Sequence, residues 1–505
     1  MPTGSRREVD PLPSKDLDIR RQLRARNPFS FTPDTAANYD YGMVNDLFCE
    51  PESFSSLTNG NNHFILGSIG TGKTIVLKAL SLAVRGGHST SGATFGGIYL
   101  PLSPFAHKAF ERHYKLTNRH EPFMHYFVLD TIKSAYEQLQ VAGVSNTDLL
   151  AIDADLRNIT GRRDLDSVES RTISSVISEL SNRMESILEQ LNSYPSTPSL
   201  DFSPRRLDLP ELLRALEVLR HRIYPSIEGR LALLIDGYDQ LGELTKVVNS
   251  LIHQEYGQRI CVIIACVHFG DFVESDVNGQ ELVYGRDYDT VVLDEGYHEA
   301  TETLDQIATG IIIRAWKEFL PAATPDQLSL RSILGPGDQS SLYHGLECFV
   351  ELSAGNIRWF LLLCRHAFKE VEVEDGLPHV PLASQERAVK SVTHSIYAAE
   401  VQSRGRAEAE GILALCDNLG RKLRSIRREG GVETSIRTPI DLPELTDPDD
   451  SRCRAAEQIL RRALRHRFLI TTEPNRVLIE RVPGFVPSEA RFSGILAPIL
   501  ELPWR

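Results

Sequence analysis

The sequence predicts an α/β fold, and continuous apolar runs that end in glycine-rich or polar turns are the observations that predict it. The three clearest runs lie at 64–66, 231–236 and 259–267. Runs of this kind are typical of strands buried on both faces of a parallel sheet that lies between helices. Two further strands are predicted at 97–102 and 288–293.

The first run leads directly into a glycine-rich turn that opens a helix. The turn reads Gly67-Ser68-Ile69-Gly70-Thr71-Gly72-Lys73-Thr74, a complete GxxxxGKT pattern. The glycines let successive backbone N–H groups point at one spot, where the helix N-terminus adds its partial positive charge. We expect this loop to bind ATP, with Lys73 on the β- and γ-phosphates and the Thr74 hydroxyl on Mg²⁺. The alternative is a glycine-rich turn that happens to carry a lysine.

The second and third runs each end near polar side chains. Because ligands of open α/β sheets bind at the carboxyl ends of strands, Asp236 is predicted to act on Mg²⁺ through water. Gly237 follows, and Asp239 is the nearest acidic residue that could orient an attacking water; its alternative role is to cap a helix N-terminus. His268 follows the third run, either as a partner of the γ-phosphate or water, or as a structural histidine.

Composition and charge limit the classes of protein to which the chain could belong. The chain has 505 residues, 41% hydrophobic and 24% charged, which is ordinary for a globular protein of two to four domains. We find neither a signal peptide nor an apolar run long enough to span a membrane, so a cytoplasmic protein with reduced cysteines is expected. The net charge of −13 argues against an extensive nucleic-acid-binding surface, although from residue 384 onward 20 Lys and Arg outnumber 17 Asp and Glu.

Changes in pattern along the chain predict its organisation. Residues 1–26 are expected to be a flexible arm, 27–298 the α/β core, 299–376 a helical region and 384–505 a basic C-terminal domain. A helical insertion in the core is predicted at about 121–206. It contains an apolar seam of nearly three heptads, which indicates either a helix packed in its own domain or an intermolecular coiled coil: Ile173, Ile177, Leu180, Met184, Ile187 and Leu191.

The C-terminal region combines helices with a predicted hairpin. Helices are expected near 384–402, 408–427 and 451–466, and a hairpin at 468–472 and 476–481. This order fits a winged helix. Four arginines on the predicted helix and wing are candidates for duplex DNA contact, or form an ordinary solvated face: Arg461, Arg462, Arg465 and Arg476.

Five segments occur in the order found in one family of ATPases. They are 27–29 (Asn-Pro-Phe), 65–74, 234–236, 353–358 (Ser-Ala-Gly-Asn-Ile-Arg) and the C-terminal winged-helix-like segment. In these features the chain resembles origin-recognition-complex-type AAA+ P-loop ATPases, and more narrowly their bacterial branch. The Asp-Gly-Tyr-Asp segment at 236–239 resembles the second acidic motif of the STAND/NACHT class.

The resemblance assigns further roles. It implies a helical lid over 299–376, a sensor 1 strand at 259–267, and Arg358 as the sensor 2 residue that reaches the γ-phosphate. An arginine at the start of a helix is the alternative for Arg358. Gly237 departs from the family because an acidic residue is expected there, and Arg286 is only a weak candidate for an arginine finger.

Two classes of function follow, with a third as an alternative. The first is a switch that binds ATP and Mg²⁺, hydrolyses ATP slowly and couples nucleotide state to a protein partner, for example in phage defence. The second is a DNA-binding ATPase in replication, transposition or a mobile element. A nucleotide-regulated scaffold without turnover is the third. Assembly into a homo-oligomer stays open.

Overall fold

The computed structural model describes most of the chain up to residue 402 and short segments after it. Residues 14–402 are described except for 31–39, 51, 86–93, 103, 118–119, 163–171, 194–199, 227, 254–258, 268–274, 294–300 and 336–342. Beyond residue 402 the described residues are 410–412, 414–415, 417–422, 425, 440–441, 455–456, 458–460, 463–464, 469–471 and 489–492.

The chain divides into two compact units. The core unit is Thr35–Gly296, and the second unit combines Met1–Asp34 with Tyr297–Arg505. The second unit is called the lid unit, after the lid that the sequence predicts at 299–376. Residues 27–30, which the sequence assigns to the core, are therefore part of the lid unit.

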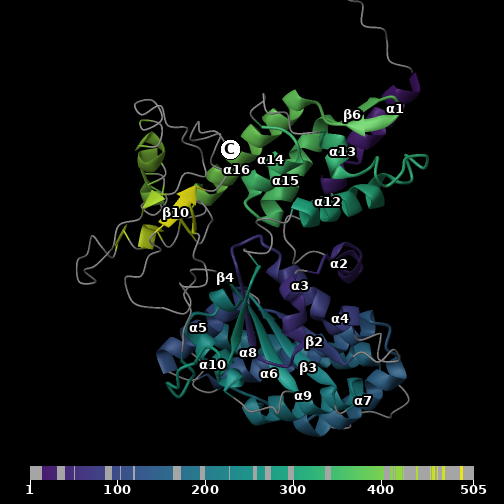
Figure 1. Ribbon diagram of the computed structural model, residues 1–505. Coiled ribbons are helices and arrows are strands. Elements are labelled where there is room, and N and C mark those ends of the chain that lie inside the picture. The colour runs from purple at the N-terminus through teal and green to yellow at the C-terminus, as the bar shows by residue number, and fades with distance from the viewer. Residues whose placement is uncertain are drawn as a thin grey trace, which may run out of the picture. The chain divides into compact units, whose positions relative to one another are not determined.

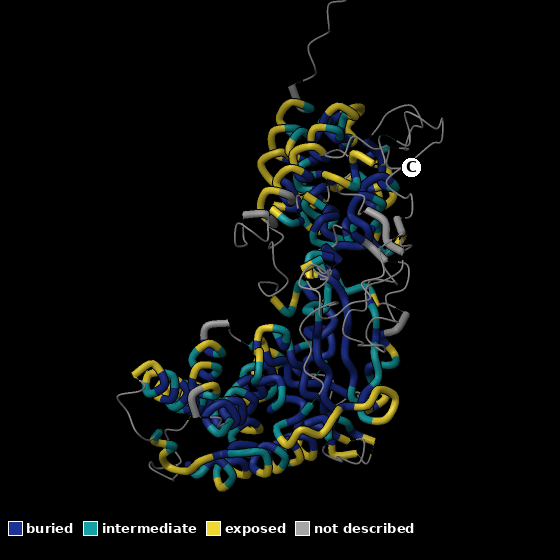
Figure 2. Tube along the Cα trace, turned by 90° about the vertical axis from the view of Figure 1, so that its left-hand side faces the viewer, coloured by how far each residue is buried: buried dark blue, intermediate teal, exposed yellow. Residues whose placement is uncertain are grey.

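The core unit contains a five-stranded parallel sheet in the order β2-β3-β4-β1-β5 (Figure 1). The strands are β1 (His63–Gly67), β2 (Phe95–Pro101), β3 (Arg230–Asp236), β4 (Ile260–Val267) and β5 (Asp289–Val292). The central strands are buried almost throughout, as the dark blue tubes of Figure 2 show. Because all five strands are parallel, β1, which leads into the glycine-rich loop, and β3, which ends in Asp236, end at the same edge of the sheet, with β4 between them.

Helices surround this sheet. They are α2 (Tyr41–Leu47), α3 (Lys73–Leu80), α4 (Leu82–Arg85), α5 (Pro104–Thr117), α6 (Glu121–Val141), α7 (Asn146–Thr160), α8 (Ile173–Asn192), α9 (Leu209–Ile223) and α10 (Thr245–Ile252). Single-turn 3₁₀ segments lie at η6 (Tyr238–Gln240) and η7 (Gly242–Leu244), and a longer one at η3 (Glu52–Thr58).

The insertion is part of the core unit. Helix α6 packs against both β2 and α8. The buried positions of α8 are Ile173, Val176, Leu180, Met184, Ile187 and Leu191. The predicted seam is thus used within the unit, which is the first of its two interpretations, and Val176 takes the buried position that the heptad spacing assigned to Ile177.

The lid unit is mainly helical. Its elements are α1 (Ser14–Ala25), η1 (Pro28–Ser30), α12 (Thr301–Trp316), α13 (Leu330–Leu334), α14 (Leu346–Ser353), α15 (Ile357–Ala367), η8 (Phe368–Glu370), β6 (Glu372–Glu374), β7 (Leu377–His379) and α16 (Leu382–Gln402). Helices α14, α15 and α16 pack in sequence order, and β6 and β7 form an antiparallel hairpin.

The predicted flexible arm over residues 1–26 is corrected for its second half, while residues 1–13 lie outside the described residues. Residues 14–25 form α1, whose Leu23 is fully buried. Arg24 Nε donates to the carbonyl O of Val371 (2.9 Å), and Arg20 pairs with Glu372. Helix α1 is therefore docked on the β6 strand of its own unit.

The Asn27-Pro28-Phe29 motif also lies in the lid unit. Asn27 Nδ2 donates to the carbonyl O of Arg365 (2.7 Å), and the ring of Phe29 meets that of Phe368 edge to face at 4.9 Å. The motif therefore anchors the N-terminal segment to α15 and η8.

The C-terminal part contains a small antiparallel sheet in the order β8-β10-β9. Strand β9 (Leu469–Thr471) pairs with β10 (Glu489–Phe492), which also pairs with β8 (Ile440–Asp441). The sequence instead pairs 468–472 with 476–481, and the second of these segments lies outside the described residues. So do the four candidate DNA-contacting arginines: Arg461, Arg462, Arg465 and Arg476. Among the described helices, none is long and apolar enough to cross a membrane.

Candidate functional site

The phosphate loop follows β1 without a break and leads into α3. Gly70 (φ 96°) and Gly72 (φ 92°) have left-handed backbone conformations that favour glycine. Lys73 is the first residue of α3, and its Nζ donates to the carbonyl oxygens of Gly67 (2.6 Å) and Ser68 (2.9 Å). A positive charge and a helix N-terminus therefore lie at the loop, which is the arrangement that binds phosphate.

The metal side of the site joins the phosphate loop to β3. The Thr74 hydroxyl donates to Oδ2 of Asp236 over 2.7 Å. A hydroxyl and a carboxylate are hard oxygen ligands of the kind that Mg²⁺ prefers, directly or through water. The residues present therefore fit Mg²⁺ bound beside a nucleotide phosphate, and the sequence predicted both of them.

A second donor reaches the same carboxylate from β2. The Tyr99 hydroxyl donates to Oδ2 of Asp236 over 3.0 Å. Burial raises the pKa of Tyr99 well above its ordinary value, and the charge of Asp236 and this hydrogen bond act in the same direction. The phenol therefore stays protonated and remains a donor at physiological pH.

A buried lysine lies one helical turn beyond Thr74. The Nζ of Lys78 is 5.7 Å from the ring centroids of both Tyr41 and Tyr99. Burial lowers the pKa of Lys78, while the negative charges of Asp236 and Asp40 oppose that shift. Sequence reasoning identified neither Tyr99 nor Lys78, although Lys78 lies at i+4 from Thr74 and thus on the same face of α3.

The turn after β3 explains why the expected acidic residue is missing at position 237. Gly237 has φ 84°, and a Cβ there would lie 3.1 Å from the carbonyl O of Leu102. The Leu102 N–H also donates to the carbonyl O of Asp236 (3.0 Å), which holds the two segments together. A glutamate at this position would be strained in backbone conformation and crowded.

Asp239 is fixed to the end of β4. The backbone N–H of Val267 donates to both of its carboxylate oxygens, at 3.0 Å to Oδ1 and 2.9 Å to Oδ2, and the Cys266 thiol donates to Oδ1 (3.1 Å). The residue that begins η6 as its N-cap is Gly237 rather than Asp239. The carboxylate therefore connects the turn after β3 to the end of the neighbouring strand.

Of the next two sequence candidates, one lies outside the described residues and the other lies in the lid unit. His268 lies just beyond β4, outside the described residues. Arg358 is the second residue of α15 in the lid unit, where the Asn356 side chain caps the helix by accepting from the N–H of Trp359 (3.1 Å). Within the described chain, Arg358 makes no side-chain hydrogen bond or ion pair.

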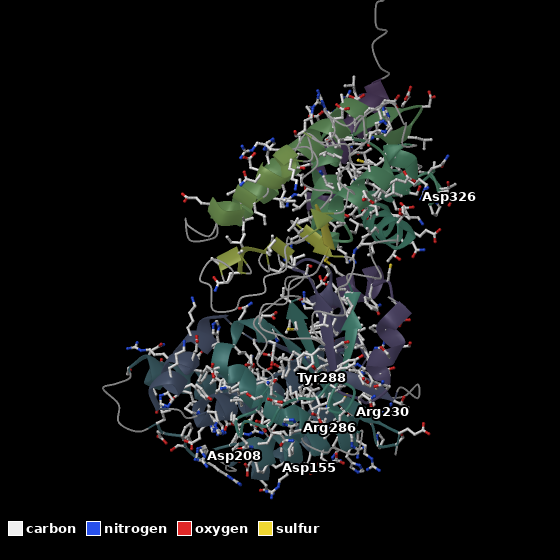
Figure 3. The ribbon with its side chains drawn as sticks, turned by 60° about the vertical axis from the view of Figure 1, so that its left-hand side comes forward. Asp155, Asp208, Arg230, Arg286, Tyr288 and Asp326 are labelled. Carbon is white, nitrogen blue, oxygen red and sulfur yellow. The ribbon has the colours of Figure 1, made fainter. Side chains whose placement is uncertain are left out.

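Arg286 does not face this site within its own chain. Its guanidinium makes two parallel bonds to Asp287 (2.9 and 2.8 Å). Asn62, the residue before β1, donates to the carbonyl O of Asp287 (3.0 Å), which places this segment at the amino-terminal edge of the sheet (Figure 3). The phosphate loop is at the opposite edge.

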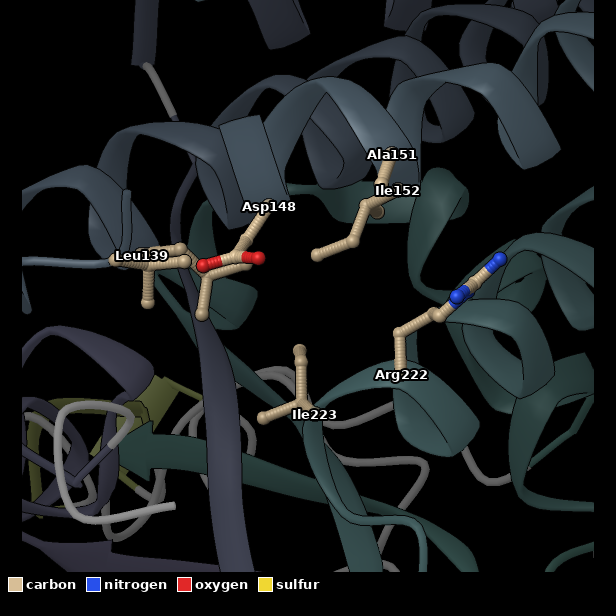
Figure 4. A pocket seen from close by; sticks show the side chains of 7 residues that line it. Leu139, Asp148, Ala151, Ile152, Arg222 and Ile223 are labelled. Carbon is tan, nitrogen blue, oxygen red and sulfur yellow. The ribbon is translucent and has the colours of Figure 1, made fainter. Parts of the chain in front are cut away.

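A cavity of about 220 Å³ lies away from the phosphate loop, among α6, α7 and α9 (Figure 4). Its lining is mostly aliphatic, with Asp148 and Arg222 at its margin. Arg222 is paired with Asp155 (2.5 Å), and Asp148 accepts from the Ser145 hydroxyl (2.7 Å). Because its lining is mostly aliphatic and includes no residue of the glycine-rich loop, the cavity does not resemble the phosphate site.

The parallel sheet, the glycine-rich loop and the Thr74–Asp236 pair define a P-loop nucleotide-binding protein. The family model described as ORC-CDC6-like matches residues 29–335 and 329–505. The chain therefore belongs to the ORC-CDC6-like family, and the predicted resemblance to AAA+ ATPases of the origin-recognition type is confirmed. No curated protein is similar enough to the chain to be matched.

Proposed function

We propose that this protein is an ATP-driven switch that binds ATP and Mg²⁺ at residues 67–74 and couples its nucleotide state to a protein partner. The observation that carries the proposal is the hydrogen bond between Thr74 and Asp236, because it joins the phosphate loop to the acidic strand at one edge of the sheet. Membership of an ATPase-like family supports the same assignment.

The chemistry of the site follows from the chain's own residues. Lys73 would place a positive charge against the β- and γ-phosphates, and Thr74 and Asp236 would hold Mg²⁺ directly or through water. Mg²⁺ held there would supply positive charge that offsets the negative charge of the phosphates. Hydrolysis is proposed to be slow, because Gly237 occupies the position at which related enzymes carry an acidic residue and its backbone conformation disfavours any replacement.

The lid unit is proposed to sense the nucleotide. Arg358 lies at the N-terminal turn of α15 with its side chain uncommitted among the described residues, which suits an arginine that binds the γ-phosphate. His268 is proposed as a second sensor at the end of β4. Loss of the γ-phosphate would then change the geometry of the lid and of a C-terminal winged helix.

The choice of partner depends on charge. The net charge of −13 opposes approach to DNA, and the acidic motif at 236–239 resembles that of signalling switches, so we favour a protein partner, for example in phage defence. The basic C-terminal region supports the alternative, a DNA-binding ATPase in replication, transposition or a mobile element. A scaffold without turnover follows if Gly237 abolishes hydrolysis.

Salt-dependent binding separates these functions. Fluorescence anisotropy would measure affinity for duplex DNA at increasing salt, with ATP or ADP, for wild type and for a variant with alanine at the four C-terminal arginines. A protein-directed switch should show no appreciable DNA binding at physiological salt. Its partner should co-purify with the wild-type protein in the presence of ATP, but not with the Lys73→Ala variant. A DNA-binding ATPase would instead bind DNA more weakly as salt increases, with log affinity falling against log salt concentration by a slope of about −0.9 per phosphate contact. The four-alanine variant would show a flatter slope.

A further inference from the structure

Two hydroxyl groups donate to a single oxygen of Asp236, the last residue of β3. Thr74 and Tyr99 both donate to Oδ2 of Asp236, at 2.7 and 3.0 Å. Among the described residues no donor reaches the other oxygen, Oδ1. The two hydrogen bonds therefore fix the rotation of the carboxylate and leave Oδ1 as the oxygen with free acceptor capacity.

The position of Tyr99 follows from the register between β2 and β3. Tyr99 pairs with Leu234, and Pro101 pairs with Asp236, so the tyrosine lies two residues before the end of the strand pair. Alternation along a strand puts residues two apart on the same face. The Tyr99 ring can therefore reach along this face of the sheet to the carboxylate.

The insertion holds this part of β2 in place. β2 is the edge strand of the five-stranded sheet, and Gln138 of α6 lies beside it. The Tyr99 N–H donates to Gln138 Oε1 (3.0 Å), and Gln138 Nε2 donates to the Tyr99 carbonyl O (2.9 Å). The amide thus pairs with both backbone groups of Tyr99, as a neighbouring strand would, and both residues are buried.

We propose that Tyr99 is a positioning residue for Mg²⁺ binding, which holds Asp236 so that Oδ1 faces the metal, and that Gln138 of the insertion holds Tyr99 in turn. The inference rests on the proposed function and assigns to this site a residue from a strand outside its motifs. Partners that orient a metal ligand commonly change metal affinity 10–100-fold when they are removed.

The simplest alternative is that Tyr99 is an ordinary buried tyrosine whose hydroxyl needs a partner. A purely structural hydroxyl would affect stability alone. A positioning hydroxyl would affect the requirement for Mg²⁺, which is therefore the quantity to measure.

The test is Tyr99→Phe, which keeps the ring and both backbone bonds to Gln138 and removes only the hydroxyl. Binding of a fluorescent ATP analogue to the full-length protein would be measured in EDTA and during a titration with MgCl₂. We expect unchanged affinity in EDTA and a half-saturating Mg²⁺ concentration raised about tenfold or more.

Tyr136→Phe is the matched control. Tyr136 is also a buried tyrosine, and its hydroxyl donates to a carboxylate, that of Asp153, over the same 3.0 Å, but within the insertion. We expect Tyr136→Phe to leave the Mg²⁺ requirement at the wild-type value, and thermal unfolding would show the loss of stability for each variant.

Three other outcomes have distinct meanings. A wild-type Mg²⁺ requirement in Tyr99→Phe would overturn the inference, provided that Lys73→Ala weakens nucleotide binding. Equal weakening with and without Mg²⁺ would overturn it too, because the tyrosine would then support the loop rather than the metal ligand. If Lys73→Ala binds as well as wild type, the proposed function itself fails.

Discussion

The candidate site residues of the core unit are held by hydrogen bonds of their own side chains, whereas the side chain of Arg358, the candidate in the lid unit, makes none with the described residues. Asp236 accepts from Thr74 and Tyr99, and Asp239 is tied to the N–H of Val267. Arg358, in contrast, is positioned by the Asn356 cap at the start of α15, and its side chain makes no polar contact with the described residues.

This difference suits the core unit and the lid unit to different roles. Groups that are already held in place lose little entropy when a ligand binds, so the core unit is suited to binding phosphate and metal in one fixed geometry. An arginine without a partner gains its interactions only when an anion reaches it. We infer that the core unit supplies affinity and that the lid unit supplies the dependence on nucleotide state.

The largest effect that would sharpen this comparison is expected at Arg358. Its loss should cost a charge-assisted hydrogen bond to the γ-phosphate, about 1.5–3 kcal/mol, or roughly 10–100-fold in ATP turnover. Stability should change by less than about 0.5 kcal/mol, because no polar contact within the described chain is lost. Turnover assays and thermal unfolding of Arg358→Ala check both parts, with Arg314→Ala of α12 as the control. A variant that loses stability but not turnover would make Arg358 a structural residue.

A smaller effect is expected for the pH dependence of the core unit. Burial lowers the pKa of His125 to about 3, with further lowering by the charges of Arg183 and Arg206, and its Nδ1 accepts from the N–H of Leu207 (2.8 Å). Because only the unfolded state takes up this proton below about pH 6.5, stability should fall with decreasing pH by at most about 1.4 kcal/mol per unit.

Thermal unfolding between pH 7.5 and pH 5 measures that slope. Asparagine is the informative replacement, since its side-chain oxygen can accept from Leu207 but does not titrate. We expect a flatter slope in His125→Asn than in wild type. Equal slopes would mean that the acid sensitivity of the core unit arises elsewhere.

The smallest effect is expected at Asp239. Both oxygens of its carboxylate already accept from the N–H of Val267, so we expect Asp239 to hold the turn after β3 in place. Asp239→Asn keeps one acceptor oxygen, and its ATP turnover should therefore fall by less than tenfold. Single-turnover ATP hydrolysis decides this point. A decrease of roughly 10²–10⁴-fold would instead assign Asp239 to the attacking water, as the sequence predicts.

The elements around the phosphate loop could be predicted because their signals are local. The apolar run before Gly67, the glycines and the apolar run ending at Asp236 each occupy consecutive residues. Tyr99 could not be predicted as a neighbour of Asp236, because that contact depends on the register of two strands more than one hundred residues apart. Gly237 was recognised as a departure, but its reason is a close approach to Leu102 that only the folded chain reveals.

Helix α1 in the N-terminal region could not be predicted from the sequence. A short, highly charged segment has little helix-forming signal of its own, and packing rather than propensity decides whether it folds. Here one buried leucine, Leu23, and the contacts of Arg20 and Arg24 with the β6 region hold α1. The Asn27-Pro28-Phe29 motif was noticed correctly, yet its place in the lid unit depends on long-range contacts with α15 that no local pattern indicates.

Nucleotide affinity of Lys73→Ala tests the central claim most directly, since everything proposed for this protein depends on ATP binding at residues 67–74. Lys246→Ala is the control, because Lys246 belongs to the same unit but pairs with Glu243 (2.8 Å) instead of lying at the loop. Titration with a fluorescent ATP analogue should show affinity reduced by an order of magnitude or more in Lys73→Ala and unchanged in Lys246→Ala, with both variants folded. Wild-type affinity in a folded Lys73→Ala protein would contradict the account.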